Sequence, residues 1–254
     1  MLAITRVGLP RRCGVLLACW GLAGTAAAGS FNISPIRADL GGSRRTAVLS
    51  ITNADDDAVV VQAHVVAWSQ ESGEERLVDT RELLATPPVM QIPAHTEQIV
   101  RVALRREPDA ARELTYRVIF EEVPQAAPTN FTGLRMALRL SIPIFVAPAQ
   151  GRSTADVAWE AHWLADGNLE VAAVNHGTGH LQVIDFDARV PGNDAALHGM
   201  TSRYVLPGSR VSWRLTADAA AAHPGAVAAH AGSIVIHGHS DQGEFSADIA
   251  DNVR

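Results

Sequence analysis

The chain has 254 residues, of which 47% are hydrophobic and 19% are charged, a balance typical of a globular protein with a sizeable core. All 21 basic residues are arginine, the 27 acidic residues give a net charge of −6, and no basic block stands out. The composition therefore excludes a disordered or fibrous chain, and it offers no electrostatic footprint for a nucleic-acid partner.

The N-terminal segment has the pattern of a secretory signal peptide. Arginines precede the apolar stretch Cys13–Ala23, which is too short to cross a hydrocarbon layer of about 30 Å. Ala26–Ala28 provide a small-residue cleavage site. We therefore expect residues 1–28 to be a cleavable signal peptide.

Two other export signals fit parts of the same segment. Arg11 and Arg12 could form a twin-arginine signal, and Cys19 could be a lipoprotein cleavage site. Cleavage after Ala28 would remove Cys13 and Cys19, which are the only cysteines, so the mature chain would have no disulfide. No other segment is apolar enough to predict stable membrane insertion.

Short apolar or alternating runs separated by turn residues dominate the rest of the chain and predict β-strands. The first series is Phe31–Leu40, Thr46–Asn53, Val59–Trp68, Ile99–Leu104, Tyr116–Val123 and Leu134–Val146. After a Pro/Gly/Ser-containing break, the second series is Val157–Leu164, Leu169–Val174, Leu181–Val190, Tyr204–Leu206, Val211–Leu215 and Ile234–His237. This spacing predicts an all-β chain of two successive β-sandwiches. Pro224 and Gly225 interrupt the Ala-rich segment 217–229, which we expect to be a loop or a short helical turn.

The alternating segment Leu134–Val146 is about twice as long as an ordinary strand. Pro143 cannot donate a hydrogen bond to a central ladder, so part of this strand is expected at the edge of a sheet. Two interpretations remain open. The segment is either a core strand with one buried face, or an edge strand that offers its apolar side chains to another chain by β-augmentation.

Several segments of the first half form a combination that is specific as a set. They are Asn32–Arg37, the Asn53 turn, Thr86–Val89, Ile99–Val102, Tyr116–Pro124 and Leu138–Val146, followed in the second half by Ser240–Gly243. Together they resemble the PapD-like periplasmic chaperones of chaperone–usher pilus assembly. The Ser141–Val146 sequence is similar to the archaic, Csu-type branch of that family.

The resemblance implies two immunoglobulin-like β-sandwich domains in an L- or boomerang-shaped arrangement, in the periplasm. The expected boundaries are residues 29–148 for the N-terminal domain, 149–153 for the linker and 154–254 for the C-terminal domain.

Members of this family donate their G1 edge strand to pilus or fimbrial subunits that lack a last strand, and deliver them to an outer-membrane usher. They use no cofactor. The implied donor residues are Leu134, Met136, Leu138 and Leu140. Self-association of the free protein would be another way to cover such an edge.

The resemblance also implies an anchor for the carboxylate at the C-terminus of the subunit. Well-known members use an Arg on the first strand and a Lys on the last strand of the first domain. Arg37 matches the Arg, but the Lys position falls at Pro143 and the chain has no Lys. We expect Arg117 to be the substitute, since it interrupts an apolar strand and can bind a carboxylate bidentately. Arg135 and Arg139 are the next candidates, and plain solvent-exposed charges are the alternative for Arg37 and Arg117.

By family position, Arg101, Glu122 and Asp241 are expected to form a bridge between the two domains. Ordinary surface pairing is the alternative for these three residues, since an exposed ion pair contributes only about 0–1 kcal/mol.

Three other classes of function were weighed against the chaperone. No nucleophile elbow, zinc-protease motif or phosphate-binding glycine loop is present, so we expect no catalytic residues. A His-rich periplasmic metal site is a second alternative, based on His176, His180, His223, His230, His237 and His239. A secreted Ig-like adhesin or structural subunit is the third.

Overall fold

The computed structural model describes residues 31–124, 136–189, 197–199, 202–216 and 233–249. The first half contains β1 Phe31–Ser34, β2 Ala38–Leu40, β3 Thr46–Asn53, β4 Val59–Glu71, β5 Glu74–Asp79, β6 Leu83–Thr86, β7 Val89–Ile92, β8 Glu97–Leu104, β9 Leu114–Glu122 and β10 Arg139–Val146. The second half contains β11 Val157–Trp163, β12 Leu169–Asn175, β13 Leu181–Arg189, β14 Leu197–Gly199, β15 Arg203–Val205, β16 Arg210–Leu215, β17 Ile234–Ser240 and β18 Gly243–Ile249.

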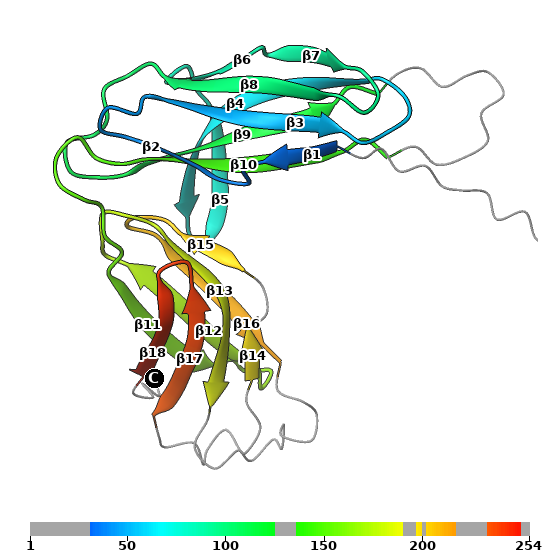
Figure 1. The fold of residues 1–254 in the computed structure, drawn as a ribbon. Coiled ribbons are helices and arrows are strands. Elements are labelled where there is room, and N and C mark those ends of the chain that lie inside the picture. The colour runs from blue at the N-terminus through cyan, green and yellow to red at the C-terminus, as the bar shows by residue number, and fades with distance from the viewer. Residues whose placement is uncertain (1–30, 125–135, 190–196, 200–201, 217–232, 250–254) are drawn as a thin grey trace, which may run out of the picture.

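These strands form two sandwiches, each with its own core. In the first, the sheet β1-β3-β8-β6 packs on the sheet β2-β10-β9-β4-β5, and β7 also pairs with β4. In the second, β11-β12-β16 packs on β14-β13-β17-β18, and β15 pairs with β13. The long axes of the two sandwiches lie at a wide angle, which gives the molecule a boomerang shape (Figure 1). The predicted all-β fold of two immunoglobulin-like sandwiches is confirmed. No helix in the described ranges is long and apolar enough to cross a membrane.

The predicted single strand over Phe31–Leu40 is wrong in one respect. It is broken after Ser34, so that β1 pairs with β3 in one sheet while β2 pairs with β10 in the other. Pro35 has no N–H group to continue a ladder, and the chain changes sheets there. This crossing leaves the segment around Arg37 beside β10.

The predicted long strand Leu134–Val146 is also shorter in the structure. β10 begins only at Arg139, and residues 136–138 are not in a strand. β10 begins where Arg139 pairs with Glu121, and its partner strand β9 ends one residue later, at Glu122. The residues that precede β10 therefore have no further β9 residues to pair with. Leu134 lies outside the described residues, as do the signal peptide and the Ala-rich segment.

Sequence patterns did not predict the strands β5, β6, β7, β14 and β18. All residues of β5 are exposed, so this strand lacks the apolar alternation that identifies a half-buried strand. It forms because it pairs with the long strand β4 along residues 66–71. The resulting β4–β5 hairpin extends from the first sandwich toward β15 of the second (Figure 1).

The hairpin and a small apolar cluster join the two sandwiches. Trp68, Phe145 and Leu206 are nearly fully buried together, with Tyr204 packed against them. The Gln70 amide donates to the Tyr204 carbonyl at 2.8 Å and accepts from the Leu206 N–H at 2.9 Å. The sandwiches are therefore in direct packing contact.

A chain of charged groups crosses the same contact. His180 Nδ1 lies 2.7 Å from a Glu113 carboxylate oxygen, and His180 Nε2 lies 3.5 Å from Asp241 Oδ2. The imidazole stacks on the Phe145 ring with centroids 3.5 Å apart. Arg37 Nη1 donates to Asp241 Oδ2 at 2.8 Å. Glu113, Phe145 and Arg37 belong to the first sandwich, so His180 and Asp241 bind the second sandwich to it.

Protonation of His180 strengthens this contact. Burial by itself lowers the pKa of His180, but hydrogen bonds to Asp241 and Glu113, and the charges of both carboxylates, outweigh it and raise the pKa above 6.5. Burial by itself raises the pKa of Asp241, but hydrogen bonds from His180, the Gln182 N–H and Arg37 lower it to about 2. When His180 is protonated, its imidazolium lies between two carboxylates.

We predict that the contact becomes weaker as the pH rises. Because the folded-state pKa of His180 is raised, its contribution is complete below the unfolded-state value and is lost as the pH passes the folded-state value. Calorimetric unfolding from about pH 6 to about pH 9 should show this loss. His180→Gln should lower stability by about 1.5–3 kcal/mol at the acidic end and remove most of the pH dependence. The exposed His237, which points away from the neighbouring His–Asp pairs, supplies the control, and His237→Gln should keep the pH dependence. Full pH dependence in His180→Gln would contradict this account.

Candidate functional site

The first feature of the site is the open edge of β10. On one side β10 pairs with β9 along its whole length. On the other side, within the described residues, β2 pairs with it only from Ile144 to Val146. Arg139–Pro143 thus have no strand partner on that side in the described part of the chain. The expectation that Pro143 lies at an edge is confirmed.

The direction of the backbone groups follows from two hydrogen bonds. The Glu122 N–H donates to the Leu138 carbonyl, so even-numbered residues of this segment face β9. The Ala147 N–H donates to the Leu40 carbonyl, so odd-numbered residues face the other side. The amides of Arg139 and Ser141 therefore face the open edge. Pro143 lacks only an N–H that would have faced the same way.

The proposed donor residues differ in exposure. Met136 is 54% exposed, whereas Leu138 and Leu140 are half-buried and pack against the first core. Leu134 lies outside the described residues. In the described part of the row, Met136 is thus the side chain that offers most apolar surface to a partner.

The two proposed anchor arginines lie in one row across three strands. Pro143 pairs with Arg117 of β9, and Ile144 pairs with Ala38, which places residue 37 beside Pro143 on the other side. Ala38 faces the core, so its neighbour Arg37 faces outward, as Arg117 does. Both arginines thus flank a proline that has no polar side chain of its own.

Arg117 is held rigidly beside the aromatic cluster that joins the two sandwiches, and the surface around this cluster and both arginines is called the cleft below. Its guanidinium carbon lies 3.8 Å from the Trp68 ring centroid, and its side chain is only 14% exposed. Nη2 donates to Glu75 Oε1 at 2.6 Å and Nη1 donates to Ser141 Oγ at 3.3 Å. Two further nitrogen atoms, Arg117 Nε and Trp68 Nε1, are buried, and neither has a hydrogen-bond partner among the described residues.

Arg37 lies nearer the second sandwich. It donates to Asp241, its Nε is 3.5 Å from Asp39 Oδ2, and its guanidinium carbon is 5.9 Å from the Phe145 ring centroid. Burial raises the pKa of Tyr204, while the positive charges of Arg37 and Arg117 both act to lower it. Both guanidinium groups therefore act on one tyrosine, which lies among aromatic rings.

The structure does not bring the predicted bridge residues together. Asp241 does link the two sandwiches, but its partners are Arg37 and His180. Glu122 lies at the end of β9 that is remote from the second sandwich and accepts a hydrogen bond from the Leu138 N–H. The predicted triad is therefore wrong for Glu122.

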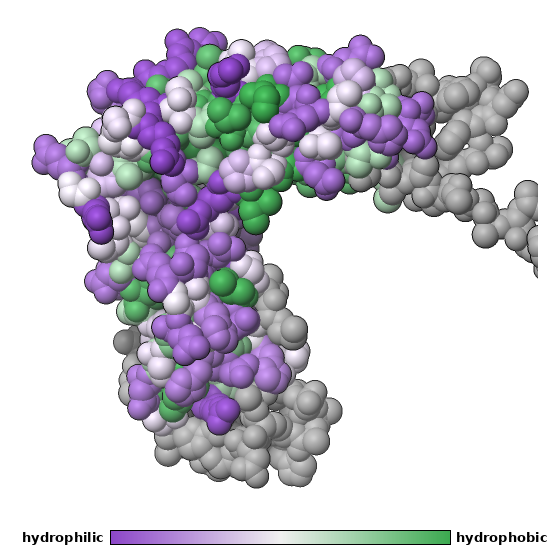
Figure 2. Space-filling model, viewed as in Figure 1, coloured by the Kyte–Doolittle hydropathy of each residue, from purple (hydrophilic) through white to green (hydrophobic). Residues whose placement is uncertain are grey.

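Arg101 lies on the opposite face of the first sandwich from the cleft. It is exposed on β8, where it pairs with Val48 of β3 and Thr86 of β6. Val48, Ile99 and Leu84 are exposed apolar neighbours on these strands. Figure 2 shows this apolar area in green on the front of the first sandwich. Arg101 therefore cannot be part of the bridge.

Sequence reasoning missed four residues of the cleft: Glu75, Trp68, Tyr204 and His180. One weak sign pointed to Trp68: it is an apolar residue at a position of β4 whose side chain faces away from the first core. His180 was noted only as one of several histidines. Glu75 gave none, because it lies on a strand without apolar alternation.

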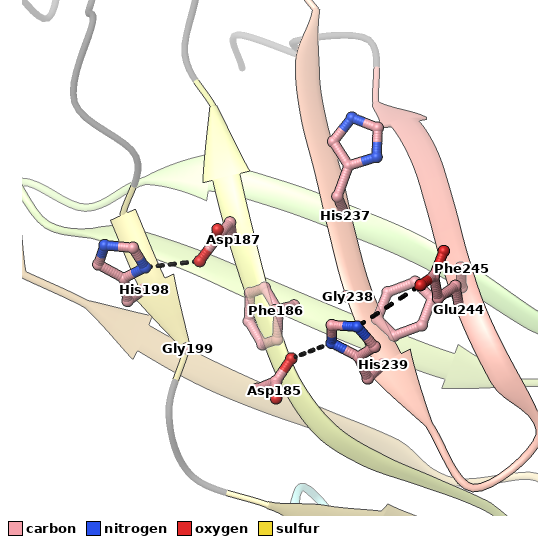
Figure 3. Close-up of a pocket in the computed structure, with 10 residues that line it drawn as sticks. All are labelled: Asp185, Phe186, Asp187, His198, Gly199, His237, Gly238, His239, Glu244 and Phe245. Carbon is pink, nitrogen blue, oxygen red and sulfur yellow. Dashed lines mark hydrogen bonds and ion pairs between the residues drawn. The ribbon is translucent and has the colours of Figure 1, made fainter.

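The histidine-rich face of the second sandwich does not converge on one point. His198 pairs with Asp187, His239 pairs with Asp185, and His237 points away from both pairs (Figure 3). Within the described residues, no group of three or more His, Cys, Asp or Glu side chains is arranged to hold a metal ion. His223 and His230 lie outside the described residues.

Comparison with known proteins identifies the architecture around this cleft. Residues 30–152 match the family of pili and flagellar-assembly chaperones, PapD N-terminal domain. No curated protein sequence matches the chain.

Several solved structures share the fold over most of the chain. The chaperone CsuC, in complex with the tip adhesion subunit CsuE of archaic Csu pili from Acinetobacter baumannii, has a TM-score of 0.65 and 19% identity; 88% of this chain and 99% of that chain are covered. The SafB chaperone, in complex with the SafA pilin of Salmonella enterica, has a TM-score of 0.57 and 16% identity, with 88% and 98% covered. The E. coli chaperone DraB has a TM-score of 0.56 and 18% identity, with 88% and 98% covered.

These identities are low enough that the solved structures establish the fold alone. The family match covers the sandwich that contains the open edge of β10 and both cleft arginines. Residues 30–152 are thus similar to the N-terminal domain of PapD-like pilus-assembly chaperones, and the chain as a whole shares their two-sandwich fold.

Proposed function

We propose that this protein is a periplasmic chaperone that caps pilus or fimbrial subunits by donating the edge of β10, and then delivers them to an outer-membrane usher. The observation that carries the proposal is the unpaired stretch Arg139–Pro143 beside a cleft with two arginines. An incomplete subunit has an open groove that needs a strand, and an exposed edge is a template for such pairing.

The proposed anchor for the C-terminal carboxylate of the subunit is Arg37 together with Arg117. The pairing of Arg117 with Pro143 supports this assignment, because Arg117 stands beside the position where other family members have the lysine that this chain lacks. Its rigid guanidinium presents fixed donors to a carboxylate, which an Arg can bind through two parallel hydrogen bonds.

The proposal extends to targeting and domain boundaries. Residues 1–28 would direct the chain to the periplasm, residues 29–148 and 154–254 would form the two domains, and 149–153 would link them. Capping needs neither a cofactor nor a catalytic group, because the binding energy comes from burying apolar side chains in the groove of the subunit. When no subunit is bound, self-association would cover the same edge.

We predict that Met136→Asp prevents subunit capture and leaves the fold intact. Met136 is exposed, so stability should change by no more than about 0.5 kcal/mol, whereas a carboxylate in an apolar groove is strongly unfavourable. The measurement is co-purification of a pilus subunit with the tagged protein from periplasm, with circular dichroism to verify folding. Leu138→Asp should act in the same direction at some cost in stability, because Leu138 also packs on the first core.

The matched control is Met136→Leu, which keeps an apolar side chain and should capture subunits normally. If Met136→Asp also captured the subunit normally, Met136 would have no part in donor-strand binding. Normal capture by the Leu138→Asp variant as well would contradict the proposed donor row.

We predict that Arg117→Ala weakens subunit binding about tenfold or more, since a hydrogen bond to a charged group contributes about 1.5–3 kcal/mol. Arg101→Ala is the matched control, because Arg101 is exposed on the opposite face of the first sandwich and should leave the affinity unchanged. Titration calorimetry with a purified subunit would give both affinities. Equal affinities for Arg117→Ala and the unmodified protein would exclude Arg117 as an anchor.

A further inference from the structure

Arg37 and Arg117 differ in how firmly their own carboxylate partners are held. Asp241, the partner of Arg37, has a side chain only 17% exposed, and it also accepts from the Gln182 N–H at 2.9 Å and lies against His180. It cannot leave without breaking the contact between the sandwiches. Arg37 therefore keeps Asp241 as its partner, and it can offer an incoming carboxylate only the donors that Asp241 does not use.

Glu75, the partner of Arg117, is held much more loosely. Its side chain is 45% exposed, and it projects from β5, a strand whose six residues are all exposed. Within the described residues, the Arg117 guanidinium is the one group that Glu75 is seen to bind with its carboxylate. Rotation into solvent would leave the carboxylate hydrated, so its departure has a small cost.

Arg117, in contrast, cannot follow Glu75 into solvent. Its guanidinium lies against the Trp68 ring and also bonds Ser141. Without Glu75 it would be a mostly buried charge without a counter-ion, which is strongly unfavourable. A fixed cation with a movable anion is an exchange site for another carboxylate.

The local hydrogen-bond balance points the same way. The buried Arg117 Nε and Trp68 Nε1 have no acceptor in the described structure, although Trp68 is only 2% exposed. Buried N–H donors are nearly always paired in folded proteins. Two unpaired donors on adjacent side chains mean that Glu75 leaves part of the hydrogen-bonding capacity around Arg117 unused.

We infer that Glu75 is an internal latch on Arg117, which occupies the carboxylate subsite of the free protein and is displaced by the C-terminal carboxylate of the subunit. The inference rests on the proposed function for the identity of the incoming ligand. Glu75 would then set the affinity for the subunit. Each binding event exchanges one carboxylate on Arg117 for another, so the gain in binding free energy is smaller than if Arg117 had no partner beforehand.

The test uses the full mature protein and sodium acetate as the probe. The NMR resonance of the Arg117 Nε–H group is followed during titration, with sodium chloride at equal ionic strength as the salt control. Glu75→Gln removes the competing charge, and we expect acetate to shift the resonance at about fivefold lower concentration than in the unmodified protein, the upper limit for a partly exposed ion pair. Glu71→Gln is the matched control, because Glu71 pairs with Arg76 on the same hairpin and is also exposed. It should titrate like the unmodified protein.

Identical titrations of Glu75→Gln and the unmodified protein would overturn the latch, as would a resonance that acetate does not move. The source of the carboxylate is tested with a peptide that copies the last residues of a subunit, as the free acid and as the C-terminal amide. We expect the free acid to bind Glu75→Gln about fivefold more tightly than the unmodified protein, and the amide to show no such gain. An equal gain for the amide would overturn the assignment to the C-terminal carboxylate.

Failure of the latch and failure of the proposed function give different results. If acetate shows the expected difference but no pilus subunit is captured, the latch is supported and the chaperone function is not. If subunits bind the unmodified protein and Glu75→Gln with equal affinity, the latch is wrong and the chaperone function stands.

Discussion

The edge of β10, which has no partner over Arg139–Pro143 among the residues that the structure describes, is the constraint on which the rest of the structure depends. Backbone N–H and C=O groups require partners, and a row of them at a sheet edge is a template for another strand. In this protein β2 pairs only with the last three residues of β10. The chain changes sheets around Pro35, so it comes to lie beside β10 only at that end of the strand. The open stretch lies next to Arg37 and Arg117, so the backbone template and the two arginines form one continuous surface.

The contact between the sandwiches gives this surface its second wall. The charged chain from Glu113 through His180 and Asp241 to Arg37 lies beside the aromatic cluster of Trp68, Phe145 and Tyr204. The same phenylalanine that stacks on His180 belongs to β10. The orientation of the second sandwich and the position of the edge strand are therefore coupled through one side chain. The cleft is a preorganised site, and a subunit would not have to pay for ordering it.

Strands with one buried face could be predicted from the sequence, since alternation is the direct imprint of a core on a strand. β3 was predicted at its observed bounds, and β9 within a residue or two. β5 could not be predicted, because pairing with β4 forms it and no core contact marks its residues. The predicted strand began five residues before β10, because the apolar alternation continues on the N-terminal side of the point where the partner strand β9 ends.

Fewer residues of the site than of the fold could be predicted from the sequence. The resemblance located Arg37, and the interruption of an apolar strand located Arg117, but spacing cannot say which face of a sandwich a position occupies. Arg101 was expected in the bridge from its family position, but it lies on the opposite face of the first sandwich. The pairing of His180 with Glu113 joins residues 67 positions apart in two different sandwiches. Such contacts depend on how the sandwiches dock, and no local pattern records that geometry.

Amide hydrogen exchange on β10, with and without a bound pilus subunit, tests the central claim most directly. The Arg139 and Ser141 amides face the open edge, whereas the Leu140 and Ile142 amides face β9. The account predicts fast exchange at Arg139 and Ser141 in the monomeric free protein and at least about tenfold slower exchange in the complex, while Leu140 and Ile142 are protected in both states. Unchanged exchange at Arg139 and Ser141 in a complex that has demonstrably formed would contradict it.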